Sequence, residues 1–314
     1  MQSLDHARTR NECRYNPLVR MTARGGALLA AIALGTAGCS GGVAQKQADA
    51  CAAAWQGGIT AVQEQTAALA EAEPLLEQRK KDAQKAAVAI EKRLDGLTIK
   101  RDEAVSAYPD KIKGRVISAK MRVGTIQPLR QEQGKPLAKV RFDVEIQGEF
   151  KRAAKTISAL YEQPKAFFLE RVEVNIADEQ KGWAILKVQF HVNTLTEPPP
   201  AIPPEPGPPA AYSDALAWTP AAECATHPAP PEVAAGRTSL QEKEALARAV
   251  RAVELLEASV KARTAIADDL IRRRDDDRAM WTPHADAIVE KAKTSVTGVA
   301  ELRFNEKGEP DWKM

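Results

Sequence analysis

The chain has few of the side chains that enzymes commonly use for chemistry. Of its 314 residues, 5% are aromatic, four are histidine and four are cysteine. The histidines are His6, His191, His227 and His284, too far apart for the short ligand spacing of a metal site. The sequence contains no serine–histidine–aspartate or cysteine–histidine arrangement and no glycine-rich phosphate loop. We therefore predict a protein that is not an enzyme, with no catalytic residue, metal or cofactor.

Two polar positions have simpler interpretations than chemistry. Cys224 and His227 are separated by two residues, but a single such pair is a weak metal signal, and we interpret both as linker residues. His191 is expected on the polar side of a strand, exposed to solvent.

The chain also lacks a strong excess of one charge. It has 45 Lys and Arg residues against 42 Asp and Glu residues, a net charge of +3 at pH 7. This excess is too small to indicate a nucleic-acid partner. Scarce aromatic residues and abundant alanine favour long helices over a large globular core.

The apolar stretch over residues 25–38 is too short to cross a bilayer. It has about fourteen apolar or small residues, against roughly 20 for a spanning helix. Arg20 and Arg24 precede it, and Thr36-Ala37-Gly38 leads into Cys39. A basic start, a short apolar middle and small residues at the cut are typical of a secretory signal. The pattern resembles a bacterial lipoprotein signal peptide over residues 1–38; an uncleaved N-terminal anchor is the alternative.

Lipidation at Cys39 predicts a membrane-anchored protein of the cell envelope that faces the periplasm. Met21 stands where such a signal would start, so residues 1–20 are interpreted as a mis-assigned upstream start. Ser40 after the cysteine, in place of Asp, favours sorting to the outer membrane, with the inner membrane as the alternative. More than one acyl chain holds a protein durably at a membrane.

Cys51 and Cys224 are the remaining cysteines after Cys13 and Cys39 are set aside. An even pair in an oxidising compartment is compatible with a disulfide. Such a bridge would close a very long loop, worth roughly 5 kcal/mol in the chain-entropy model. Two unpaired thiols are the alternative.

Residues 43–112 have apolar side chains at helical spacing with charged residues between them. We predict a helical segment in two pieces, interrupted at Gly57-Gly58 and restarted at Pro74, which suits a first helical position. The apolar stripe indicates packing against another helix.

A second long helix is predicted over about 239–280. The capping box Ser239-Leu-Gln-Glu242 would open it, and its apolar residues advance by threes and fours. The mixed charges of Arg272–Arg278 indicate a solvated face, with anionic lipid as the alternative partner. After Pro283 a shorter helix is expected to about Thr294.

Between these helical segments the apolar period changes to two, which is typical of strands. Strands are predicted at 115–123, 138–147, 167–176 and 183–192, with a helix over 149–161. The order helix, strand, strand, helix, strand, strand predicts a compact α+β layer pair.

The remaining segments are a proline-rich linker and a C-terminal strand. Tyr212 and Trp218 would pin the linker to a surface, or else act as solvent-tolerant spacers. A lone strand near the C-terminus is unstable by itself and should pair with the sheet or a partner. The predicted divisions are 39–112 (tether and helices), 113–196 (α+β domain), 197–236 (linker), 237–296 (helices) and 297–314 (strand and tail).

Val140–Val192 resembles the periplasmic domain of PilO, a type IV pilus assembly protein, and of its type II secretion relative GspM. The matching features are a strand ending in Gly148, then Phe150, a helix with Ile157, Leu160 and Tyr161, Pro164, and the strand Phe168–Ile176. The resemblance implies a permuted ferredoxin-like fold, αββαββ, flanked by coiled-coil helices. It also implies a scaffold that dimerises or joins related envelope assembly proteins. The resemblance implies the inner membrane, whereas Ser40 favours the outer membrane.

A periplasmic lipoprotein that binds a small ligand or peptidoglycan is the alternative function. Its support is Trp55, Trp183, Trp218 and Trp281, because aromatic rings can stack on sugars. A pocket that collects two of these rings would favour this function, and scattered rings would argue against it.

Overall fold

A computed structural model of the chain describes residues 41–100, 107–163, 165–204, 206–224 and 229–314. The chain divides into two compact units, residues 1–49 and 50–314. The predicted signal and Cys39 lie outside the described residues, as does His227. Apart from Gly41–Asp49, with which helix α1 begins, the features below belong to the second unit.

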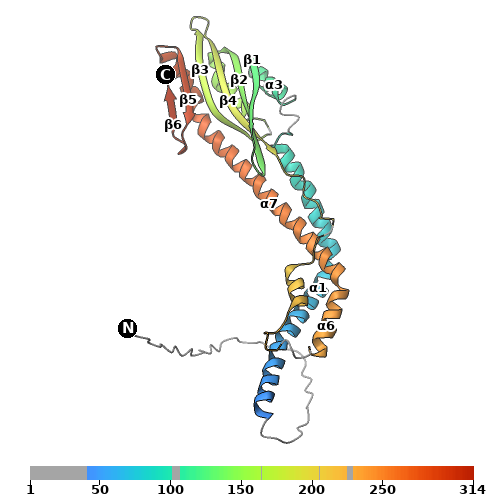
Figure 1. Cartoon of the computed structure of the whole chain (residues 1–314). Coiled ribbons are helices and arrows are strands. Elements are labelled where there is room, and N and C mark those ends of the chain that lie inside the picture. Colours follow the sequence, from blue (N-terminus) through green and yellow to red (C-terminus); the bar gives the residue numbers. More distant parts are fainter. Residues whose placement is uncertain (1–40, 101–106, 164, 205, 225–228) are drawn as a thin grey trace, which may run out of the picture. The chain divides into compact units, whose positions relative to one another are not determined.

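Long helices pack side by side in this unit (Figure 1). They are α1 (Gly41–Leu97), α6 (Pro231–Glu242) and α7 (Glu244–Trp281). The buried side chains of α1 recur at every seventh position: Trp55, Val62, Leu69, Leu76, Ala83 and Ile90. This is the spacing of a helix that presents one seam to a neighbouring helix. The seam contacts buried side chains of α6 and α7, including Leu240 and Leu256.

The predicted breaks in α1 are wrong, because the helix runs through Gly57, Gly58 and Pro74. Pro74 lies on the exposed side of α1. The two glycines lie beneath the ring of Trp218. At the two glycines, tertiary packing has therefore overridden a low helix propensity.

The start of the α+β domain also differs from the prediction. Helix α3 (Tyr108–Ser118) begins within the stretch predicted as helical, but it also includes residues 115–118, which the sequence pattern predicts as the beginning of a strand. Ile112 and Val116 are four residues apart and both buried, so the same apolar residues satisfy a helical period. Strand β1 (Arg122–Glu132) begins later than predicted, and its two register shifts and Pro128 disturb the alternation of its side chains.

The other elements of the domain lie where the period-two pattern and the helical spacing predict them. They are β2 (Leu137–Glu149), the short 3-10 helix η1 (Phe150–Arg152), α4 (Ala153–Leu160), β3 (Phe167–Asp178) and β4 (Trp183–Leu195). After α7 come η2 (Thr282–His284), α8 (Ala285–Thr294), β5 (Val299–Phe304) and β6 (Pro310–Lys313).

The described strands form a six-stranded antiparallel sheet in the order β1-β2-β4-β3-β5-β6. The predicted pairing of the C-terminal strand with the sheet is confirmed, since β5 pairs with β3. The observed helices and strands thus follow the order α3-β1-β2, α4-β3-β4 and α8-β5-β6. The predicted αββαββ order is present, and a third helix with two strands extends it.

Three helices, α3, α4 and α8, cover one face of the sheet. Their buried side chains, such as Ile112, Ile157 and Ile288, share one apolar core with the inward residues of the strands. Alternate residues of β2 are buried and the residues between them are partly exposed, as a sheet covered on one face requires. A smaller cluster at the ends of α1 and α7 joins the helix pair to the sheet through Phe168.

The segment predicted as a linker is packed against the helix pair. It contains α5 (Ala210–Ala217), whose Tyr212 is buried and donates a hydrogen bond from its hydroxyl to the carbonyl of Leu240 at 2.9 Å. Tyr212 and Trp218 therefore do pin this segment to a surface.

The predicted role of the capping box is wrong. Ser239 lies inside α6, which begins at Pro231, and α7 begins at Glu244. Proline is favoured at a first helical position, and Val233 and Leu240 anchor α6 through buried contacts, so the helix starts earlier than the box.

Candidate functional site: the polar sheet face and the bridged helix pair

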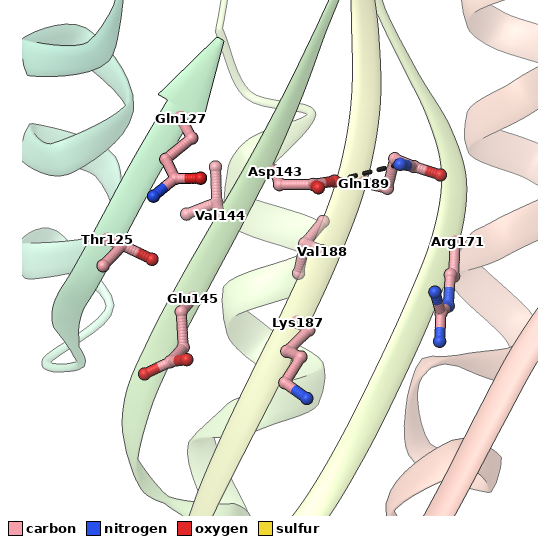
Figure 2. A pocket seen from close by; sticks show the side chains of 9 residues that line it. All are labelled: Thr125, Gln127, Asp143, Val144, Glu145, Arg171, Lys187, Val188 and Gln189. Carbon is pink, nitrogen blue, oxygen red and sulfur yellow. Dashed lines mark hydrogen bonds between the residues drawn. The ribbon is translucent and has the colours of Figure 1, made fainter. Parts of the chain in front are cut away.

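The polar face of the sheet holds a dense group of charged and amide side chains. A hollow of about 160 Å³ lies on this face, and Figure 2 shows the side chains that line it. It is lined by Thr125, Gln127, Asp143, Val144, Glu145, Arg171, Lys187, Val188 and Gln189. Gln189 donates to the carboxylate of Asp143, its register partner, at 3.0 Å. The strand alternation that buries one face sends these polar residues to the other.

Ion pairs join several of the charged side chains at and beside this hollow. Glu173 and Glu301 are register partners on β3 and β5, and both accept hydrogen bonds from the guanidinium of Arg171. Lys187 lies 3.1 Å from Glu173, and Arg303 lies 2.6 Å from Glu301. Burial would raise the pKa of Glu301, but Arg171 and Arg303 outweigh it and lower that pKa. Arg171 thus allows Glu173 and Glu301, two like charges, to lie opposite each other on neighbouring strands, which stabilises the sheet.

His191 is less exposed than predicted. It lies on the polar face, but only 12% of its side chain is exposed because its ring stacks on Phe168 at 4.9 Å. Its Nδ1 lies 2.8 Å from Glu170, which also accepts a hydrogen bond from Arg141. Burial tends to raise the pKa of Glu170, yet these two partners lower it overall. His191 is thus one member of a packed polar cluster.

One carboxylate connects α7 to the sheet and to α4. Asp277 accepts hydrogen bonds from the hydroxyl of Tyr161 at 2.6 Å and from the backbone N–H of Leu169 at 3.0 Å. Burial raises the pKa of Asp277 to about 6, although these hydrogen bonds act in the opposite direction. The sequence gives no sign of this role, because Asp277 stands within the charged run Arg272–Arg278, whose pattern indicates a solvated face.

The sulfur atoms of Cys51 and Cys224 are bonded at 2.00 Å, across a sequence separation of 173 residues. The bridge connects α1 to the proline-rich segment. Close by in the sequence, the rings of Trp55 and Trp218 lie 5.8 Å apart. Trp218 also covers Gly58, where a Cβ atom would lie 2.5 Å from the ring.

A buried arginine holds the beginning of the proline-rich segment. Arg263 of α7 is 4% exposed. Its guanidinium donates to the carboxylate of Glu91 at 2.7 Å, to the carbonyl of Glu197 at 3.0 Å and to the carbonyl of Pro198. The hydrogen bonds satisfy a charge that would otherwise be costly to bury.

Trp55, Trp218 and Trp281 are packed against other parts of the chain. Trp281 is buried in the sheet core and donates from Nε1 to the carbonyl of Leu169 at 3.2 Å. Trp183 pairs with Glu149 and Asp178 at the start of β4. Trp55 is buried, and Trp218 rests on the glycines of α1. The two rings that meet therefore fill a contact between segments.

Within the described ranges, no group of three or more His, Cys, Asp or Glu side chains is arranged to hold a metal ion. Among the helices that the structure describes, none combines the length and apolar character of a membrane span.

These features define an α+β protein in which an antiparallel sheet is joined to long paired helices. No protein-family model and no curated protein matches the chain. Among solved structures, the type 4 fimbrial biogenesis protein PilO from Pseudomonas aeruginosa is similar, with 12% identity and a TM-score of 0.29. The alignment covers 43% of this chain and 98% of that one. Similarity at this level does not establish a function.

Proposed function

We propose that the chain is a non-enzymatic, lipid-anchored protein of the bacterial cell envelope that acts as a PilO-like assembly scaffold. The observation that carries this proposal is the joining of a two-layer α+β domain to a long, bridged helix pair. Arg171, Lys187, Glu173 and Glu301 on the polar sheet face are engaged in ion pairs with one another, which is compatible with a structural surface. The Cys51–Cys224 bridge and the signal pattern before Cys39 support an oxidising compartment.

In this proposal the lipid at Cys39 holds the protein at a membrane and the helix pair carries the α+β domain. The domain has the permuted ferredoxin-like arrangement, and a second copy or a related assembly protein is the partner. The side of α1 that carries Val88 is a candidate contact surface, because this apolar side chain is 72% exposed. Lys81, Lys85 and Lys92 border Val88 on the same side of the helix.

Metabolic lipid labelling and in-cell crosslinking test the two parts of this proposal. The wild-type chain should incorporate labelled fatty acid, and Cys39→Ala should not. Fractionation of the two membranes should recover the wild-type chain in one of them, with the outer membrane favoured by Ser40.

A photo-crosslinking residue at Val88 should capture a second copy or an envelope protein. The same residue at Ala83, which is buried against the neighbouring helix, is the matched control and should crosslink within the chain. A chain without lipid, or a strict monomer that captures no envelope protein, would contradict the proposal.

A further inference from the structure

A basic hollow lies between α3 and the residues that follow α4, on the helix-covered side of the domain. Its volume is about 410 Å³. The residues that line it are Lys111, Gly114, Arg115, Ser118, Gln163 and Lys165. Among the described residues, the lining brings together three cationic side chains, a hydroxyl and an amide, and it includes no carboxylate. It is separate from the polar sheet face of Figure 2.

Two of the cations are available to a ligand. Lys111 and Arg115 stand four residues apart on α3, so they project from one side of the helix. Neither forms an ion pair with a residue that the structure describes. Lys165 is fixed in place, because its ammonium donates to the carbonyl of Thr98 at 2.6 Å and to that of Asp95. Its charge still adds to the positive potential of the hollow.

Gln163 supplies an independent sign of a missing ligand. It is 7% exposed, and its amide nitrogen Nε2 is buried without a hydrogen-bond partner in the described structure. Its amide oxygen accepts a hydrogen bond from the hydroxyl of Tyr108 at 2.9 Å, which leaves the nitrogen as the free end. Burial raises the pKa of Tyr108, so this hydroxyl remains protonated. A buried unpartnered donor is costly and uncommon in native proteins.

We propose that this hollow binds a phosphate group, held by Lys111, Arg115 and the Nε2 of Gln163. A phosphate offers several acceptor oxygens and a negative charge, which matches two cations and an amide donor approaching from different elements. The guanidinium fork of an arginine fits phosphate geometry, and lysine adds a point charge. The group could belong to a free phosphate or to a phospholipid headgroup. The proposal does not depend on the scaffold function.

Titration calorimetry tests the site on the whole chain, purified with its own lipid in a neutral detergent. One arm adds inorganic phosphate at constant ionic strength. A second arm adds short-chain phosphatidylglycerol in mixed micelles, with short-chain diacylglycerol, which lacks phosphate, as its reference. The test variant is Lys111→Gln with Arg115→Gln. The matched control is Lys113→Gln with Lys155→Gln, which removes the same charge from exposed positions of α3 and α4.

The affinity should fall about tenfold or more in the test variant, which corresponds to about 1.4 kcal/mol. In the control it should fall less than about twofold. Gln163→Glu, which replaces the donor by a carboxylate, should weaken binding similarly. Binding of phosphate alone identifies a free anion as the ligand, and binding of phosphatidylglycerol alone identifies a lipid headgroup. The proposal is wrong if neither ligand binds saturably, or if test variant and control lose equal affinity.

Discussion

At the scale of single residues, Asp277 shows how one side chain can couple three elements. It stands on α7, accepts a hydrogen bond from Tyr161 after α4 and another from the backbone of β3 at Leu169. Burial makes the ionised carboxylate less favourable, which is why its pKa is raised to about 6. Its ionisation state therefore affects how firmly the long helix is held to the sheet.

The pH dependence of stability should reveal this coupling. In the folded chain the pKa of Asp277 is about 6, against about 3.9 in an unfolded chain. Between these values the folded state binds more protons, so the contribution of Asp277 is fully present below about pH 4 and lost as the pH rises to about 6. Asp277→Asn should therefore gain stability relative to wild type by about 2 kcal/mol between pH 4 and pH 7. Urea unfolding at several pH values measures this, with Asp276→Asn, an exposed neighbour, as a control that should show no such trend.

Gly58 illustrates a different residue-scale constraint, the close approach of a ring to a helix backbone. A Cβ atom there would lie 2.5 Å from the ring of Trp218. Although alanine is the better helix former by about 1 kcal/mol, Gly58→Ala should destabilise the chain by about 1 to 3 kcal/mol. In a Trp218→Ala background the same change should become stabilising. Gly96→Ala, where a Cβ would meet no atom within 4 Å, is the control. Thermal unfolding would contradict the prediction if Gly58→Ala behaved like Gly96→Ala.

At the scale of elements, Arg263 fastens the proline-rich segment to the helix pair. Arg263→Met should lower the free energy of unfolding by about 3 kcal/mol, because it leaves Glu91 and two backbone carbonyls without their donor. Adding Glu91→Leu should recover part of the loss, since replacing both members of a buried pair is often neutral. Arg248→Met removes only an exposed pair with Glu244 and should cost less than about 0.5 kcal/mol. Equal losses for the two arginine variants in chemical unfolding would contradict this role.

The elements also show which parts of the fold can be predicted from sequence. The strands β2 and β4 were predictable, because one buried face gives each an alternation of buried and more exposed residues over most of its length, and β3 keeps this alternation around Val172 and Val174. Helix α3 was not, since Ile112 and Val116 fit a short strand pattern as well as a helix. The breaks at Gly57-Gly58 were predicted from propensity, while the actual reason for the glycines, the ring of Trp218, comes from a segment far along the chain. Long-range contacts of this kind leave no local periodicity.

The candidate sites also differ in how far the sequence alone could predict them, because some depend on long-range contacts. Cys51 and Cys224 could be singled out as a pair by counting cysteines, because few alternatives existed. Asp277, Arg263 and the hollow at Gln163 could not, since each depends on burial by elements distant in sequence. A charged run gives no sign of which member faces inward.

At the scale of the second unit as a whole, the chain order makes the helix pair and the sheet interdependent. The sheet takes β1 to β4 from before Cys224, and β5 and β6 from after it. The bridge from Cys51 to Cys224 encloses the first four strands in a loop of 173 residues. Helix α7 follows the bridge in the chain and leads, through α8, to β5, which pairs with β3, and to β6, which pairs with β5. Separation of the helices would therefore remove support from the edge of the sheet.

This arrangement predicts one cooperative unfolding transition that depends on the bridge. Cys51→Ser with Cys224→Ser should lower the unfolding free energy by up to about 5 kcal/mol, the chain-entropy value for so long a loop. Near-ultraviolet circular dichroism reports the packed aromatic core, and far-ultraviolet circular dichroism reports the helices. Both signals should shift together to lower urea in the double variant, because helices and sheet share the contacts at Phe168 and Trp281. If the helix signal moved while the core signal stayed at the wild-type midpoint, the two parts would be energetically independent, and the bridge would stabilise the helix pair alone.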